Sequence, residues 1–189
     1  MRVIAGEFKG RKLFAPKGSG VRPTADRVKE AIFSIVHSRL PNSVCIDMFS
    51  GSGALGIEAL SRGAARSYFC DNSPASIEAL KENLSACGVD GEHAIVIAKD
   101  WRAAASRIDE KCNLVFIDAP FNMCEHYPQI LERLAVGRVL EDGARLVIER
   151  GASAGDYALP RGFVRIADKR YGSVGVDLIV YTDDGEGND

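Results

Sequence analysis

The sequence predicts a Rossmann-like α/β fold, with a mostly parallel seven-stranded sheet, helices packed on it and a C-terminal antiparallel hairpin. Strand-like and helix-like apolar segments alternate five times along the middle of the chain, and parallel strands need crossover connections of this kind. A glycine-rich turn, Gly51, Gly53 and Gly56, follows the first of these strands. The last two strand-like segments, 164–171 and 174–181, have no helix between them, which indicates a hairpin at the sheet edge.

The N-terminal part of the chain precedes this alternation. Residues 2–14 alternate roughly around Gly6 and Gly10, which predicts a short basic β-hairpin. Residues 16–23 contain Gly and Pro and are predicted to be a linker. A helix with Thr24 as its N-cap is predicted next, because four apolar residues recur at helical spacing: Val28, Ile32, Ile35 and Val36.

The alternating region is predicted from its apolar runs and helix signals. The predicted strands are 44–46, 66–70, 94–98, 114–117 and 145–148. The predicted helices between and after them are 54–62, 73–87, 101–108 and 127–136. The second of these helices opens with Ser73-Pro74, and proline is tolerated there because the first helical N–H has no intrahelical partner. The final hairpin is predicted to turn at Gly172-Ser173.

Composition indicates one globular domain outside membranes. With 189 residues, 46% of them apolar, the chain can bury a full core in a single domain, predicted as residues 1–182. Residues 1–22 are its basic hairpin and linker, and residues 183–189 are predicted to be a disordered acidic tail. No apolar run approaches the roughly 20 residues that span a bilayer, and the first residues show no signal-peptide pattern. We expect a cytoplasmic protein.

Cysteine and histidine usage predicts no metal site. The five cysteines are odd in number, lack C-x-x-C spacing and lie mostly in apolar segments, which indicates buried free thiols. The three histidines are scattered without ligand spacing.

The net charge of −2 conceals a basic N-terminal stretch. Residues 1–39 contain nine Lys or Arg and three acids, a charge of +6. Such a stretch fits contact with phosphates, and charge alone equally allows a solvated surface.

Two acids flank the glycine-rich turn as a nucleoside-binding site requires. Asp47 follows the first strand, and Asp71, with Asn72 beside it, lies about twenty residues beyond the first glycine, where a carboxylate can accept from ribose hydroxyls. NAD and S-adenosylmethionine (SAM) sites share this pattern. We favour SAM, because a carboxylate at Asp47 would repel a pyrophosphate but attract the ammonium group of SAM. The chain is also short for an NAD-dependent oxidoreductase with a substrate domain.

The tetrapeptide Asp118-Ala119-Pro120-Phe121 directly follows the fourth strand. A carboxylate at a strand end, a stiff turn and an aromatic ring can accept an amino N–H while stacking on a flat heterocycle. The tetrapeptide differs by one residue from the Asp-Pro-Pro-Phe/Tyr tetrad with which methyltransferases hold an exocyclic amino group of a nucleobase. Because the fourth strand lies beside the first at the switch point of such sheets, we predict that this catalytic element faces the SAM site.

Three further residues have two interpretations each. Asp100 can accept from the adenine amino group and Trp101 can cover the ring, or the pair is an N-cap aspartate beside a half-buried indole. Phe49 is either a second wall of the cofactor site or a core residue. The sequence leaves these alternatives open.

Two longer segments, residues 22–30 (RPTADRVKE) and 47–63 (DMFSGSGALGIEALSRG), closely resemble the RsmD family. These bacterial enzymes methylate N2 of one guanine in 16S ribosomal RNA. The resemblance implies a class I SAM-dependent methyltransferase, with 16S rRNA or the assembling small ribosomal subunit as partner, and we expect a monomer. It also implies RNA phosphate contacts from five N-terminal cations, Lys9, Arg11, Lys12, Arg22 and Arg27, although for Arg27 a helix-surface charge is an equal alternative.

The chain departs from the family pattern at two positions. Ala119 stands where the family tetrad has proline, which keeps the backbone carbonyl as an acceptor but removes the φ restraint that aims it. Phe69 stands where the family usually has glutamate, two residues before Asp71, so Asp71 is expected to bind the ribose alone. DNA adenine-N6 or cytosine-N4 methylation, and a non-catalytic protein that binds SAM and RNA, remain alternatives.

Overall fold

A seven-stranded sheet forms the centre of the structure, with the strand order β3-β2-β1-β4-β5-β7-β6. The structure is a computed structural model and describes residues 1–16 and 26–183. The parallel strands are β1 Val44–Met48, β2 Arg66–Asp71, β3 Ala94–Ala98, β4 Cys112–Ile117 and β5 Leu140–Gly151. The antiparallel strands are β6 Phe163–Tyr171 and β7 Val174–Tyr181, and β7 pairs with β5. The predicted fold class and C-terminal hairpin are confirmed.

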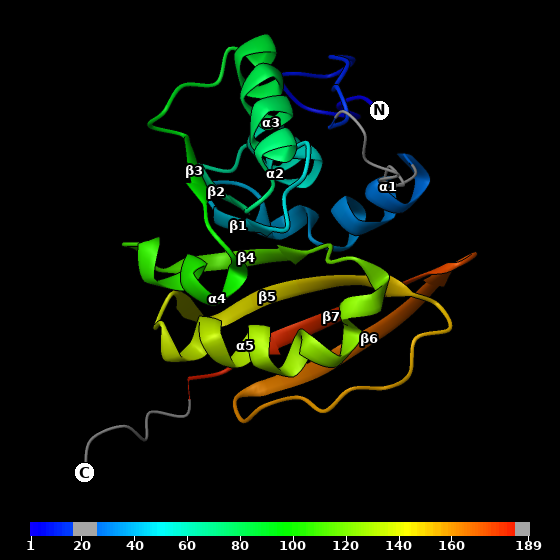
Figure 1. Ribbon diagram of the computed structural model, residues 1–189. Coiled ribbons are helices and arrows are strands. Elements are labelled where there is room, and N and C mark those ends of the chain that lie inside the picture. The colour runs from blue at the N-terminus through cyan, green and yellow to red at the C-terminus, as the bar shows by residue number, and fades with distance from the viewer. Residues whose placement is uncertain (17–25, 184–189) are drawn as a thin grey trace.

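Helices cover both faces of the sheet (Figure 1). One face carries α1 Asp26–Ile35, α2 Ala54–Ser61 and α3 Pro74–Cys87, and the other carries α4 Trp101–Ala104 and α5 Tyr127–Val136. Short 3-10 turns lie at η1 His37–Arg39, η2 Ala105–Arg107 and η3 Phe121–His126. Each face closes its own core because strand side chains alternate, with Cys45 in one core and Ile46 in the other. No helix in the described residues is long and apolar enough to cross a membrane.

Most element boundaries differ from the sequence prediction by no more than two residues, and the larger differences concern β5 and the helix after β3. β5 begins at Leu140 instead of residue 145, because Leu140 pairs with Cys112 before an irregularity brings Arg145 opposite Leu114. The predicted helix 101–108 is α4 followed directly by η2. Several predictions lie outside the described residues, namely the N-cap Thr24, the linker after Pro16, and the acidic tail after Asp183.

The five cysteines are free thiols, as predicted, and four of them are buried. Burial raises the pKa of the Cys45 thiol to about 12. These sulfurs therefore pack as small apolar groups in the cores.

The N-terminal segment, residues 1–16, is an irregular form of the predicted β-hairpin. Three backbone hydrogen bonds of 2.9–3.0 Å join its arms, from the N–H groups of Val3, Gly10 and Leu13 to the carbonyls of Arg11, Val3 and Met1 respectively. Its two arms run antiparallel, but an isolated bridge between Arg2 and Lys12 takes the place of paired strands. Other backbone donors of the segment go to α2, where the Glu58 carboxylate accepts two N–H groups at 2.8 and 3.0 Å, those of Ile4 and Ala5. A backbone group bonded to a side chain is not available for a strand ladder, so the arms pair only in part and the segment packs on α2.

Glu58 is the centre of a buried ionic cluster that holds the N-terminal segment. Its side chain is fully buried and pairs with Lys29 Nζ of α1 at 3.0 Å and with Arg62 Nε at 2.8 Å. Lys29, also fully buried, donates to a backbone carbonyl of the N-terminal segment at 2.6 Å. Gly6 is required nearby, since its φ is +84° and a Cβ there would lie 1.7 Å from the Ser61 carbonyl oxygen.

Candidate active site

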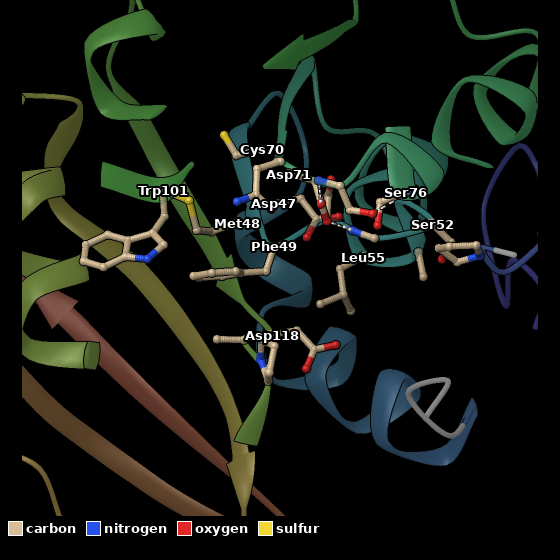
Figure 2. A pocket seen from close by; sticks show the side chains of 18 of the residues that line it. Asp47, Met48, Phe49, Ser52, Leu55, Cys70, Asp71, Ser76, Trp101 and Asp118 are labelled. Atoms are coloured by element: carbon tan, nitrogen blue, oxygen red, sulfur yellow. Dashed lines mark hydrogen bonds between the residues drawn. The ribbon is translucent and has the colours of Figure 1, made fainter. Parts of the chain in front are cut away.

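A cleft of about 980 Å³ lies at the carboxyl ends of the parallel strands (Figure 2). This volume is in the range of sites that bind small molecules and cofactors. The cleft brings together eleven residues predicted for the site: Asp47, Phe49, Gly51, Asp71, Asn72, Asp100, Trp101, Asp118, Ala119, Pro120 and Phe121. Gly53 does not line the cleft and instead forms the N-cap of α2.

The loop between β1 and α2 owes its shape to left-handed backbone conformations. Gly51 has a φ of +53° and Gly53 a φ of +80°, which glycine adopts without steric cost. Phe49 has a φ of +63°, an uncommon conformation for a bulky residue. This conformation turns the chain sharply after β1 and leaves the Phe49 side chain on the cleft wall (Figure 2).

Gly56 lets α2 pack closely on β2. A Cβ at this position would lie 2.3 Å from Phe69 Cε1 and 2.7 Å from Ser67 Oγ. Phe69 is fully buried in the core under α2 and does not line the cleft. The departure from the family glutamate therefore places an apolar core residue there, and Asp71 is the acid at the end of this strand.

Asp71 ties the glycine-rich loop to the start of α3. Its Oδ2 accepts from the Gly51 N–H and its Oδ1 accepts from the Ser73 N–H, both at 2.8 Å. These two bonds hold the carboxylate in one orientation on the cleft wall. Each carboxylate oxygen keeps acceptor capacity for a further donor.

Asp47 is a buried carboxylate in β1. It is 1% exposed, and its Oδ2 accepts from the Gly56 N–H at 2.8 Å in the first turn of α2. Burial raises the pKa of Asp47 well above its usual value of 3.8; the Gly56 bond opposes this, and the charges of Asp118 and Asp71 add to it. A cation bound beside Asp47 would stabilise the ionised carboxylate and so lower its pKa.

Each of the five parallel strands brings a carboxylate to the cleft. Asp47, Asp71 and Glu149 lie within β1, β2 and β5, whereas Asp100 and Asp118 follow β3 and β4. Figure 2 shows three of them, Asp47, Asp71 and Asp118, around the same space. Acidic side chains outnumber the basic ones on this wall, which are Lys99 and Arg102. A surplus of negative charge favours a ligand that carries positive charge.

Glu149 is a cleft residue that the sequence reasoning missed. It is 5% exposed and lies near Asp118, because Ile148 of β5 pairs with Ile117 of β4. A signal was available, since Glu149 directly follows the predicted strand 145–148, as Asp118 directly follows its own strand.

Asp100 and Trp101 form the N-cap pair of one interpretation, and their place in the cleft is compatible with the other. Asp100 is the N-cap of α4, where its carboxylate accepts from the Arg102 N–H and guanidinium, each at 3.0 Å, and from the Asn72 amide at 3.4 Å. Trp101 is 6% exposed, with the Arg102 guanidinium 4.4 Å from its ring centroid. Both residues also line the cleft, so the residues that begin α4 also form part of the cleft wall.

The tetrapeptide 118–121 forms the part of the cleft wall that follows β4. The Asp118 N–H lies 3.5 Å from the Met48 carbonyl oxygen, which places this turn beside the end of β1. Ala119 is 1% exposed and packs into the core, whereas Pro120 is exposed. Phe121 is 39% exposed, so much of its ring is open to an incoming group.

Four of the five predicted RNA-binding cations are described by the structure, and none of these four lines the cleft. Lys9, Arg11, Lys12 and Arg27 are exposed, whereas Arg22 lies outside the described residues. Both ends of the N-terminal segment reach the cleft, since Met1 and Pro16 line it. The basic segment therefore borders the site without contributing its cations to the site's wall.

This strand order, with its cleft at the carboxyl ends, defines a class I SAM-dependent methyltransferase fold. A family model described as conserved hypothetical protein 95 matches residues 1–180. The chain belongs to this family, which is the RsmD family that the sequence resembles.

Individual relatives agree along most of the chain. Ribosomal RNA small subunit methyltransferase D of Escherichia coli strain K12 is 32% identical over 180 residues, which cover 94% of this chain and 88% of the relative. The protein of the same name from Haemophilus influenzae is 35% identical over 153 residues, which cover 79% of this chain and 78% of the relative. The solved structure of yhhF from Escherichia coli has a TM-score of 0.82 and 30% identity, with 96% of this chain and 98% of that chain covered.

Proposed function

We propose that this protein is a SAM-dependent methyltransferase that modifies the N2 amino group of a guanine in 16S rRNA, as a monomer in the cytoplasm. The observation that supports it most strongly is the position of Asp118, in one cleft with the partly exposed ring of Phe121 and the carboxylates of the other parallel strands. Relatives named as small-subunit rRNA methyltransferases point to the same class of substrate.

The side chains of the cleft fit SAM better than NAD. SAM carries a sulfonium and an ammonium group with one carboxylate, whereas NAD carries two phosphates that a wall of carboxylates would repel. Asp47 would attract the ammonium group, Asp71 would accept from the ribose hydroxyls, and the adenine would lie among Phe49, Asn72, Asp100 and Trp101. When bound, SAM supplies an electrophilic methyl group, so no side chain has to form a covalent bond with the substrate.

The tetrapeptide 118–121 would hold the guanine. Its amino group is a poor nucleophile because the nitrogen lone pair is delocalised into the ring. Asp118 and the backbone carbonyl of Ala119 would accept the two amino hydrogens, which draws the lone pair out of conjugation and orients it. Phe121 would stack on the extruded base. The amino nitrogen becomes positively charged, and therefore acidic, as it gains the methyl group. Asp118 can then accept the proton that it releases without being a strong base.

The N-terminal segment would hold the RNA backbone beside this site. Lys9, Arg11 and Lys12 are exposed on a segment whose two ends reach the cleft. Positive side chains in such a place neutralise phosphates and give binding that weakens with salt. Arg27 is exposed on α1 and would extend the same basic surface.

Methyl transfer to ribosomal RNA tests this proposal. Tritiated SAM would be incubated with the protein and with either 16S rRNA or small-subunit particles from cells that lack the enzyme, and the labelled nucleotide would be mapped. We expect label on N2 of a guanine. Label on adenine N6, or on DNA in preference to RNA, would establish one of the alternative amino-methyltransferase activities, and SAM binding without any label would leave a binding protein.

Asp47→Asn should separate stability from cofactor affinity. Because the folded-state pKa of Asp47 is raised above 3.8, its contribution to stability is present at low pH and is lost as pH rises through the folded value. The difference in melting temperature should therefore shift in favour of the variant as the pH rises above 3.8. SAM affinity should fall by about tenfold or more, since the attraction for the ammonium group is lost. Thermal melts and calorimetry measure both effects, and a SAM affinity that is unchanged would remove Asp47 from the cofactor site.

A further inference from the structure

Phe14 is a large aromatic side chain that the fold leaves in solvent. It is 58% exposed, and its ring makes no aromatic or cation–π contact with another residue of the described ranges 1–16 and 26–183. Neither hydrophobic core includes it, although Phe8 of the same segment packs against one of them. Packing therefore does not explain an aromatic residue at this position.

The backbone of Phe14 is nevertheless fixed by a buried side chain. Asn83 of α3 is fully buried, and its Oδ1 accepts from the Phe14 N–H at 2.8 Å while its Nδ2 donates to the Phe14 carbonyl at 2.9 Å. The same amide nitrogen donates to the Ser52 carbonyl of the glycine-rich loop at 2.9 Å. The exposed ring is thus attached to a rigid point of the fold, which lowers the entropic cost of binding against it.

The surroundings of Phe14 match a nucleic acid. Pro16, two residues further on, lines the cleft, and so does Ser52, to which Asn83 connects the Phe14 backbone. On the other side along the chain, Arg11 and Lys12 are exposed. An aromatic face beside cations is the combination that binds single-stranded RNA, since the ring stacks on a base while the cations neutralise phosphates.

We propose that Phe14 is a second base-binding position, on which an unpaired nucleobase of the substrate RNA stacks while the target guanine occupies the cleft. This inference rests on the proposed function and adds a substrate contact to it. The N-terminal segment then acts in two ways on the same RNA strand. Its cations supply affinity that depends on salt, and the Phe14 ring supplies affinity that does not.

The test compares RNA binding by Phe14→Ala, Phe14→Trp and Lys12→Gln with that of the unmodified protein, over a series of salt concentrations. Stacking of one base contributes enough that Phe14→Ala should weaken binding of unmethylated 16S rRNA about 5- to 150-fold, with an unchanged salt slope. Lys12→Gln should instead make the negative slope of log affinity against log salt shallower by about 0.7–0.9. Val136→Ala, which trims a side chain 72% exposed at the end of α5, is the control and should bind RNA normally.

Phe14→Trp supplies a direct optical signal. It should retain RNA affinity, and its added fluorescence should be quenched when RNA binds, because an indole stacked on a base loses emission. The single native tryptophan, Trp101, is measured in the unmodified protein and subtracted. Calorimetric SAM affinity should be the same in all four variants, since Phe14→Ala keeps both backbone bonds to Asn83.

Three results would overturn the inference while leaving the proposed function intact. The first is methyl transfer by the unmodified protein with no loss of RNA affinity in Phe14→Ala. The second is a loss in Phe14→Ala that disappears at high salt, which would indicate a disturbed phosphate contact. The third is a loss of affinity in Phe14→Ala for small-subunit particles but not for free 16S rRNA, which would indicate that the Phe14 ring contacts a ribosomal protein and not a base. Absence of methyl transfer by the unmodified protein would instead reject the proposed function.

Discussion

Replacing Asp118 with alanine should lower methyl transfer about 10²- to 10³-fold while SAM affinity changes by no more than a few-fold, as for the removal of one oriented polar group from an active site. The carboxylate is placed to accept an amino hydrogen and orient the nitrogen lone pair, and no other side chain of the tetrapeptide 118–121 can accept a proton. SAM would bind mainly around Asp47 and Asp71, whose hydrogen bonds to the Gly56 and Gly51 N–H groups the substitution leaves in place.

Single-turnover methyl transfer and calorimetry with SAM measure the two quantities separately. Asp118→Asn keeps the shape of the side chain and one acceptor oxygen, so its loss of rate should be smaller than that of the alanine variant. Asp109→Ala, a carboxylate bonded to the Tyr68 hydroxyl outside the cleft, serves as the matched control. If Asp118→Ala turned over at a near-normal rate, another group would have to hold the amino nitrogen.

Glu58→Ala should reduce the free energy of unfolding by about 3–5 kcal/mol, the range for breaking a buried ion pair on one side. The substitution would leave Lys29 charged in a fully buried position and two backbone N–H groups of the N-terminal segment without their acceptor. Chemical denaturation at neutral pH measures the loss. RNA binding should weaken as well, because residues 1–16 are held on α2 through this carboxylate.

An exposed ion pair, Asp156 with Arg165, provides the control for this loss of stability. Asp156→Ala removes a carboxylate that is 82% exposed, and its partner Arg165 keeps Asp177, so the expected change is about 0–1 kcal/mol. The double variant Glu58→Gln/Lys29→Met should lose less stability than the two single changes added together, since it removes both buried charges. A loss below about 1 kcal/mol in Glu58→Ala would show that the cluster is dispensable.

The Glu58 cluster also decides how the N-terminal segment can be studied. Deleting residues 1–14 would strip Glu58 and Lys29 of their backbone partners, so lower RNA affinity in such a protein would not distinguish lost phosphate contacts from lost structure. Single substitutions of exposed residues such as Lys12 or Phe14 leave the cluster intact. They are therefore the cleaner probes of RNA contact.

The site was predictable to the extent that it lies at strand ends. Asp47, Asp71, Asp100 and Asp118 each follow or end an apolar run that can be recognised locally, and parallel strands present their carboxyl ends at one edge of the sheet. Glu149 follows the same rule but was not predicted. Its position beside Asp118 depends on the pairing of β5 with β4, which the sequence of β5 alone does not show.

The succession of strands and helices along the chain, the glycine-rich loop and the acids beside it could all be predicted from the sequence. They depend on hydrophobic periodicity, turn-forming residues and strand ends, which are local properties of a chain. The tertiary structure decided where backbone donors of the N-terminal segment go. The arms of the predicted hairpin do bond to each other. The N–H groups of Ile4, Ala5 and Phe8, however, donate to the side chains of Glu58 and Ser61, more than 50 positions away along the chain. The bonds of Asn83 to Phe14 and Ser52 join three distant segments in the same way. Such pairings depend on which surfaces the folded sheet and helices bring together, and no local pattern records them.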